Sequence, residues 1–249
     1  MLDNRKTLYP ETSFGEFSDI DFAVTFFNRV NALIDPTSIV LDFGCGRGVH
    51  ENDPSKYRRD IQILKGKVQR VIGVDVDEEA SSNPYIDEFH LLASTSLPLE
   101  DASVDICISR SVVEHLEDPA AFFEEMKRVI RPGGYLCIVT PNKRSYFGIA
   151  SRLIPNSIHS TVLKRVMPSS FRDDEDVFPT LYRCNTINEM KKILTQNEFA
   201  EHVVYGYEGE PQYLSFSSLA YRIGILHQKV APHFIKPVMF VFAKRGTSA

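Results

Sequence analysis

Three alternating glycines directly follow a short apolar segment near the start of the chain. Residues 38–43 are predicted to form a buried strand, and in residues 44–48 every second position is glycine. Glycine permits a sharp backbone turn and leaves no Cβ in the way of a ligand. Free N–H groups at the start of the helix expected next can hold an anion. This order predicts the ligand-binding edge of an α/β fold.

Strand and helix signals alternate through the first two thirds of the chain, which predicts a parallel sheet covered by helices on both faces. Further strands are predicted at residues 71–76, 88–92, 104–109 and 135–140. Helices are predicted at residues 17–33 and 119–130, the second with Asp118 as N-cap and Pro119 at its first position. Thr186 and Glu189 then form a capping box for a helix to about residue 197, followed by strands at 199–207 and 238–244.

The composition is that of an ordinary globular α/β protein. The 249 residues are 43% hydrophobic and 24% charged, and no apolar run approaches the roughly 18 residues that span a bilayer. The first residues lack the apolar segment of a signal peptide. We expect one domain over residues 1–249, with a core at about 16–142 and 186–245 and helical insertions at about 143–185 and 209–235.

The cysteines are widely spaced and form no C-x-x-C pair. Three of them fall inside apolar runs, so the sequence predicts buried, reduced thiols in a cytoplasmic protein. These residues are Cys45, Cys107, Cys137 and Cys184.

An acidic residue, Asp75, ends the second predicted strand. An acid at the tip of the neighbouring strand is placed to accept both hydroxyls of a ribose. The alternative is a surface aspartate that caps the next turn. A nicotinamide-binding loop, G-x-G-x-x-G, would need a third glycine or alanine at position 49, where this chain has Val49. A nicotinamide-dependent oxidoreductase therefore remains only as an alternative.

Five motifs carry a family resemblance: V-L-D-F-G-C-G-R-G at 40–48, V-I-G-V-D at 71–75, L-P-L-E-D-A-S-V-D at 97–105, V-V-E-H-L at 112–116 and R-V-I-R-P-G-G-Y at 128–135. Their order over about residues 36–142 closely resembles class I methyltransferases that use S-adenosylmethionine (SAM), with the type 11 group the most similar. The resemblance implies a Rossmann-like, mostly parallel sheet of seven strands with an antiparallel last strand. More loosely, T-P-N at 140–142 and F-P-T-L-Y-R-C-N-T at 178–186 resemble methyltransferases of bacterial envelope-polysaccharide loci.

The resemblance implies SAM as cofactor and assigns its binding residues by position. The pocket for the methionine part is assigned to Asp42, Gly44, Cys45, Gly46 and Gly48. Asp75 would hold the ribose and Val76 would pack on the adenine. The family often has an acid for the adenine amino group where this chain has Ala93, so backbone groups near Ala93 or the Ser94 hydroxyl are expected to substitute. Ser109 and Arg110 are expected to meet the amino acid end of SAM through backbone groups.

Methyl transfer from a sulfonium requires mainly alignment and exclusion of water, and a base only where the acceptor keeps its proton. His115, with Glu114 beside it, is the candidate base, since histidine titrates near neutrality. The alternative is that both residues order the start of the next element beneath the pocket. Some quinone O-methyltransferases carry E-x-x-E-H here, linked to metal binding, but this chain has Ser111 at the first glutamate position. We therefore predict no metal.

The expected function is methyl transfer to a small-molecule acceptor, at an oxygen of an anionic, saccharide or lipid-linked substrate. A non-catalytic SAM-binding regulator is a further alternative, because methyltransferases need few catalytic residues. Nucleic acid is not an expected partner, since the chain has no N/D-P-P-Y/F motif and no basic tail.

The charge is unevenly distributed. Residues 143–172 contain six basic side chains and residues 211–249 contain five, and neither stretch contains an acid. Within the second stretch, apolar residues recur at helical spacing: Phe216, Leu219, Ile223, Leu226 and Val230. One hypothesis is that both stretches form a helical substrate cover that suits an anionic or lipid-linked acceptor, or a peripheral dock on an anionic membrane. The alternative is that the apolar residues pack on the domain and the basic residues are solvated.

Overall fold

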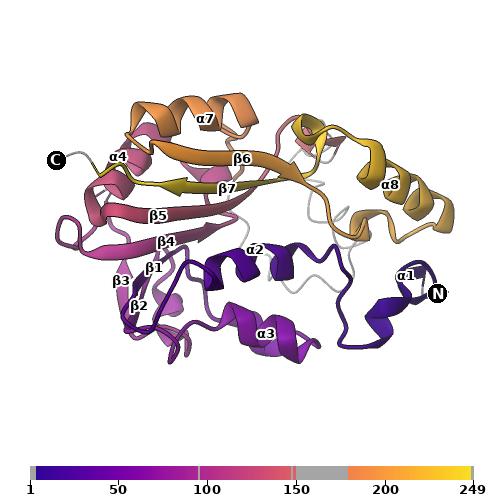
Figure 1. The fold of residues 1–249 in the computed structure, drawn as a ribbon, viewed down its shortest axis with the longest axis horizontal. Coiled ribbons are helices and arrows are strands. Elements are labelled where there is room, and N and C mark those ends of the chain that lie inside the picture. The colour runs from indigo at the N-terminus through magenta and orange to yellow at the C-terminus, as the bar shows by residue number, and fades with distance from the viewer. Residues whose placement is uncertain (1–3, 95, 147, 150–178, 248–249) are drawn as a thin grey trace.

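A computed structural model of the protein describes residues 4–94, 96–146, 148–149 and 179–247. Its centre is a seven-stranded sheet with the strand order β3-β2-β1-β4-β5-β7-β6 (Figure 1). The strands are β1 (Ile39–Phe43), β2 (Arg70–Asp75), β3 (Glu88–Leu91), β4 (Val104–Arg110), β5 (Ile130–Pro141), β6 (Glu201–Tyr207) and β7 (Val238–Lys244). Strands β1 to β5 pair in parallel, and β7 lies antiparallel between β5 and β6. The predicted Rossmann-like sheet with an antiparallel last strand is confirmed.

Helices cover both faces of this sheet, as predicted (Figure 1). One face carries α2 (Phe22–Asn31) and α3 (Lys56–Gln62), and the other carries α4 (Pro119–Val129) and α7 (Ile187–Gln196). Two further helices, α1 (Asn4–Leu8) and α8 (Ser218–Val230), lie beyond the edge at which the parallel strands end. Short 3₁₀ helices complete the described elements: η1 (Pro10–Ser13), η2 (Val49–Asn52), η3 (Glu78–Ser82), η4 (Val113–His115), η6 (Gln212–Leu214) and η7 (His233–Ile235).

Two hydrophobic cores lie on the two faces of the sheet, because successive strand residues point to opposite sides. Val40 of β1 packs with Phe26 of α2, whereas the next residue, Leu41, packs with Phe123 of α4. The four cysteines are buried and form no disulfide, which confirms the prediction of buried thiols. No helix among the described residues has the length and apolarity needed to cross a membrane.

Local capping decides where several helices begin. The helix predicted at 17–33 starts only at Phe22, because the Asp21 carboxylate accepts hydrogen bonds from the backbone N–H groups of Ala23 and Val24, each at 3.0 Å. The capping box of α7 is confirmed, with Thr186 Oγ1 accepting from the Glu189 backbone N–H at 3.2 Å.

Two local predictions were wrong. The glycine loop runs into the 3₁₀ turn η2 rather than directly into a helix, and α3 begins later, with Ser55 as its N-cap. Helix α4 ends at Val129, as the Pro-Gly-Gly sequence predicted, but strand β5 begins at Ile130 and not at residue 135. The strand accommodates the Pro-Gly-Gly sequence through a register shift in its pairing with β4, between Val104 and Ile106.

The predicted helical insertions are described only in part. Most of the first, about 143–185, lies outside the described residues, together with most of its basic side chains. Lys143 is described, and its ammonium is 2.6 Å from Glu189 Oε1. The second insertion, about 209–235, contains η6, α8 and η7.

Candidate functional site

The glycine loop adopts the left-handed conformation at all three of its glycines. Their φ angles are 79° at Gly44, 54° at Gly46 and 77° at Gly48. A Cβ on Gly44 would lie 2.2 Å from Val112 Cγ2, and a Cβ on Gly48 would lie 2.6 Å from Asn83 Oδ1. A Cβ on Gly46 would meet no atom within 4 Å. Gly44 and Gly48 thus permit close packing of the protein itself, whereas Gly46 borders open space.

Asp75 joins the end of β2 to this loop. Its Oδ2 accepts a hydrogen bond from the Gly46 backbone N–H at 2.8 Å, and its Oδ1 accepts one from the Asp77 N–H at 3.0 Å. Asp75 therefore caps a turn, as the alternative interpretation predicted, and also lies against the glycine loop, while its role toward a ribose stays a prediction. Val76, the predicted adenine contact, is adjacent and exposed.

A buried asparagine that the sequence analysis missed holds the loop from the other side. The Asn83 amide donates to the carbonyl oxygens of Cys45 and Gly46, both at 3.0 Å. Asn83 is followed by proline, so the sequence signalled a turn but gave no indication of a contact 37 residues away. These two hydrogen bonds fix the loop carbonyls.

Asp42 and Arg110 lie beneath the loop, on the face of the sheet covered by α2 and α3. Both line a cavity of about 20 Å³, together with His50 and Gln62. Arg110 Nη1 donates to Gln62 Oε1 at 2.8 Å, and its guanidinium carbon lies 5.0 Å from the ring centre of Phe27. The expected contact between the Arg110 backbone and the amino acid end of SAM stays a prediction. The Arg110 side chain adds a positive charge to the cavity, and the sequence did not indicate this position.

Burial raises the pKa of the Asp42 carboxyl to about 6, against the opposing effect of the Arg110 charge. Burial also lowers the pKa of His50 to about 4, so this ring is neutral near neutral pH. The cavity therefore contains a carboxylate whose charge is incompletely compensated and can be stabilised further by a cationic group.

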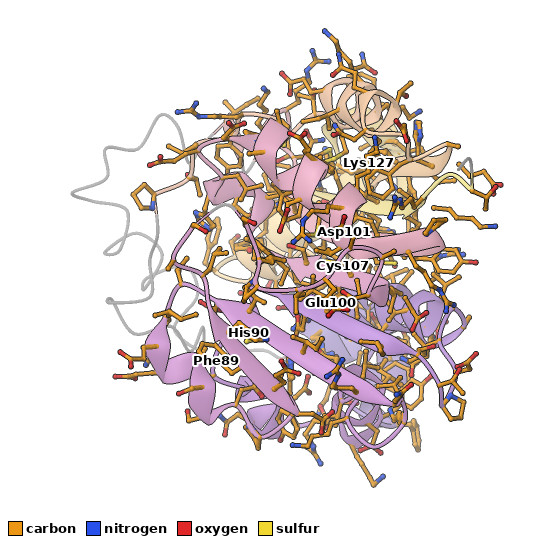
Figure 2. The ribbon with its side chains drawn as sticks, turned by 90° about the vertical axis from the view of Figure 1, so that its left-hand side faces the viewer. Phe89, His90, Glu100, Asp101, Cys107 and Lys127 are labelled. Carbon is orange, nitrogen blue, oxygen red and sulfur yellow. The ribbon has the colours of Figure 1, made fainter. Side chains whose placement is uncertain are left out.

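The remaining predicted cofactor residues surround the same edge. Ser109, at the end of β4, is fully buried, and its hydroxyl has no hydrogen-bond partner among the described residues. Ala93 and Ser94 are exposed in the loop that follows the edge strand β3, whose residues Phe89 and His90 are visible in Figure 2. Leu92, just before them, donates its N–H to the Asp75 carbonyl at 2.8 Å. These residues are thus close to the glycine loop in the fold.

Glu114 and His115 lie in η4, after β4. Glu114 is 3% exposed, and its Oε2 accepts a hydrogen bond from Thr140 Oγ1 at 2.9 Å. His115 Nδ1 lies 2.9 Å from the Pro179 carbonyl oxygen, and its Nε2 lies 3.8 Å from Glu114 Oε1. Because a carbonyl can only accept, Nδ1 carries the proton in the neutral ring and Nε2 carries the lone pair.

The segment 179–186 packs against this pair. The Glu114 carbonyl accepts from the N–H groups of Leu181 at 2.7 Å and Tyr182 at 3.1 Å. Asn185 Nδ2 donates to Thr140 Oγ1 at 2.7 Å, which extends the polar chain to Glu114. Two motifs that looked separate in sequence, residues 140–142 and 178–186, thus meet at Glu114. Thr140 and Asn185 stood in those motifs, but their spacing gave no sign of this contact.

No group of three or more His, Cys, Asp or Glu side chains within the described ranges is arranged to hold a metal ion. The structure brings together the glycine loop, Asp75, Asp42 and the end of β4, and it places Glu114 and His115 on the segment after β4.

Comparison with known proteins shows what the central part of the chain is similar to. Residues 41–138 match the family described as Methyltransferase domain. A probable S-adenosylmethionine-dependent methyltransferase of Mycolicibacterium smegmatis is 38% identical over 112 residues, which make up 43% of this chain and 39% of that protein. The chain thus spans about two fifths of the length of the curated relatives it matches.

Solved structures share the fold over most of the chain. A SAM-dependent methyltransferase from Archaeoglobus fulgidus has a TM-score of 0.55 and 19% identity, covering 96% of this chain and 99% of that one. Geranyl diphosphate C-methyltransferase from Streptomyces coelicolor A3(2), crystallised with Mg²⁺, geranyl diphosphate and S-adenosylhomocysteine, has a TM-score of 0.53 and 15% identity, covering 90% and 77%.

Proposed function

We propose that this chain, which belongs to the class I methyltransferases through its domain at residues 41–138, transfers a methyl group from SAM to a small molecule. The observation that carries the proposal is the contact between the glycine loop and Asp75, 29 residues apart in sequence and joined at 2.8 Å. It places a carboxylate beside a loop whose middle glycine borders open space. A ribose and an amino acid group can bind on either side of this contact.

The residues at this edge suit SAM in charge and polarity. The Asp42 carboxylate, whose pKa is raised by burial, can attract the ammonium of the methionine part. Asp75 can accept the ribose hydroxyls, and the exposed Val76 side chain offers an apolar surface to the adenine. The buried Ser109 hydroxyl supplies a further polar group. SAM itself supplies an electrophilic methyl group, so the chain must mainly align it and exclude water.

Asp75→Ala is expected to weaken SAM binding by about 1–3 kcal/mol, because it removes hydrogen bonds to a charged acceptor. Titration calorimetry on the folded variant measures this loss. Asp101→Ala is the matched control, since Asp101 is an exposed carboxylate in the loop before β4, paired with Arg128 (Figure 2). Unchanged affinity in Asp75→Ala would refute the ribose assignment.

SAM affinity is also expected to depend on pH through Asp42. Its pKa of about 6 leaves the carboxyl neutral below that pH and charged above it. Binding of the cationic cofactor should therefore be strongest above pH 6 and fall as the pH drops through this value. SAM affinities measured on both sides of pH 6 test this prediction. The Asp42→Asn variant should bind SAM weakly at every pH. A steep pH dependence that persists in Asp42→Asn would assign the titration to another group.

For the acceptor, we infer an oxygen of an anionic, saccharide or lipid-linked molecule. The lone pair on His115 Nε2 supports an oxygen acceptor, because a hydroxyl must lose its proton during transfer. The exposed Arg144 and Arg222, in stretches without acids, support an anionic one. Transfer of tritiated methyl groups to envelope sugar, lipid and quinone fractions tests this proposal, with a heat-denatured protein as control.

Binding and turnover together distinguish the alternative functions. An oxidoreductase would bind NAD in preference to SAM, and a regulator would bind SAM without releasing S-adenosylhomocysteine in any acceptor fraction. The expected result is SAM binding, no competition by NAD, and release of S-adenosylhomocysteine with one active fraction. Preferential binding of NAD would overturn the proposal.

A further inference from the structure

Helix α8 turns its apolar side chains toward solvent. Leu219, Ile223, Leu226 and Val230, which are three or four residues apart and so share one side of the helix, are each 57% to 70% exposed. Phe216 just before the helix is 61% exposed, and Phe234 in η7 is 54% exposed. Apolar residues at this spacing normally face a core. A contiguous exposed group of them indicates a surface that binds something.

The opposite side of α8 is fixed to the rest of the molecule. Tyr221 is 2% exposed, and its ring lies 6.3 Å from that of Tyr9. A Cβ on Gly224 would lie 2.6 Å from Pro211 Cβ, so the helix packs tightly there. His227 Nδ1 lies 2.7 Å from Oε2 of the buried Glu208. The helix cannot rotate its apolar side inward without breaking these contacts.

Positive charge flanks the apolar side. Arg222 and Lys229 are exposed. At helical spacing the two share one side of the helix, along one flank of the apolar residues. Residues 211–249 contain five lysines and arginines and no aspartate or glutamate. We propose that the α8 surface, formed by Phe216, Leu219, Arg222, Ile223, Leu226, Lys229 and Val230, docks on the surface of an anionic membrane. Apolar side chains enter the interface while the basic ones meet lipid phosphates.

A second copy of the chain fits this surface less well. A symmetric dimer through α8 would face Arg222 and Lys229 of one copy toward the same basic segment of the other. Because residues 211–249 contain no aspartate or glutamate, the side chains of that segment could not balance these charges. Anionic lipid headgroups supply the missing negative charge.

Docking would also orient the candidate active site. Helix α8 lies beyond the edge of the sheet where the parallel strands end, the edge that also carries the glycine loop (Figure 1). Membrane binding would therefore turn this edge toward the bilayer and favour a lipid-linked acceptor. This consequence rests on the proposed methyl transfer, whereas the docking itself does not.

The test is co-sedimentation of the full chain, without SAM, with vesicles of phosphatidylcholine alone or of phosphatidylcholine mixed with phosphatidylglycerol. The expected result is binding to the mixed vesicles and little binding to the neutral ones. The double variant Leu219→Glu with Ile223→Glu should lower the partition coefficient by about tenfold or more. Arg222→Gln and Lys229→Gln should each lower it about fivefold on mixed vesicles only.

Val203→Glu is the matched control, because Val203 is an apolar residue of β6 with similar exposure, 59%. It should bind like the unaltered chain, and circular dichroism should show all variants folded. Equal binding to neutral and mixed vesicles, or equal loss in Val203→Glu, would overturn the proposal. So would a dimer that dissociates in the α8 variants and binds no vesicle. Since the assay needs no cofactor, failure of SAM binding would refute the proposed function and leave docking intact.

Discussion

His115→Gln is expected to lower methyl-transfer turnover by about 100-fold or more, while SAM affinity stays unchanged. The Pro179 carbonyl, 2.9 Å from Nδ1, fixes the tautomer so that Nε2 can accept a proton. The Glu114 carboxylate, 3.8 Å from Nε2, can stabilise the imidazolium that forms. Glutamine retains a polar side chain of similar reach but cannot act as a base near neutral pH. Single-turnover kinetics with saturating SAM measures the effect.

His90→Gln is the matched control for this variant. His90 lies on the edge strand β3 (Figure 2), and its Nε2 is 2.7 Å from Glu88 Oε1, so it forms a second glutamate–histidine contact away from η4. It should retain full turnover. Near-normal turnover in His115→Gln would make His115 a structural residue.

Gly44→Ala is expected to destabilise the fold by about 3 kcal/mol or more. The residue has a φ of 79°, and the new Cβ would lie 2.2 Å from Val112 Cγ2. The left-handed conformation costs an alanine about 1–2 kcal/mol, and overpacking costs typically 1–3 kcal/mol more. For a domain of this size the melting temperature should fall by roughly 10 °C. Thermal denaturation followed by circular dichroism measures the shift.

Gly46→Ala should separate cofactor binding from stability. Its φ of 54° carries the conformational cost, but the new Cβ meets no atom within 4 Å. We expect a loss of about 1–2 kcal/mol in stability together with a loss of SAM affinity, since the methyl group enters the proposed pocket. Gly66→Ala is the control, with a φ of 82°, similar open space and a position outside the site. If Gly66→Ala weakens SAM binding as much as Gly46→Ala does, the pocket lies elsewhere.

Much of this fold was predictable because its signals are local. Short apolar runs identified the strands, Thr186 and Glu189 identified the start of α7, and the alternating glycines identified the turn after β1. These patterns act within a few residues, where backbone sterics and capping decide the conformation. The early start of β5 was missed because it depends on the pairing of Ile130 with Val104 of β4, whereas the Pro-Gly-Gly sequence follows the end of α4 as predicted.

Part of the candidate site could likewise be read from residue order. A glycine loop after one strand and an acid at the end of the next predicted a shared binding edge, since parallel strands end on the same side. The 2.8 Å contact between Gly46 and Asp75 agrees with that prediction. The roles of the individual residues toward SAM remain predictions, as does the role of His115 as a base.

Residue order alone predicted the succession of strands and helices, the class of fold and the position of the glycine loop, because each depends on neighbours along the chain. The three-dimensional packing establishes which distant polar groups meet: Asn83 with the loop carbonyls, Thr140 with Glu114, and Asn185 with Thr140. The packing also establishes that the apolar side of α8 faces outward. Apolar spacing alone allows this side to face either the core or solvent. The contacts of Tyr221 with Tyr9 and of Gly224 with Pro211 select the second orientation. Such contacts depend on how elements pack in space, and no local pattern encodes them.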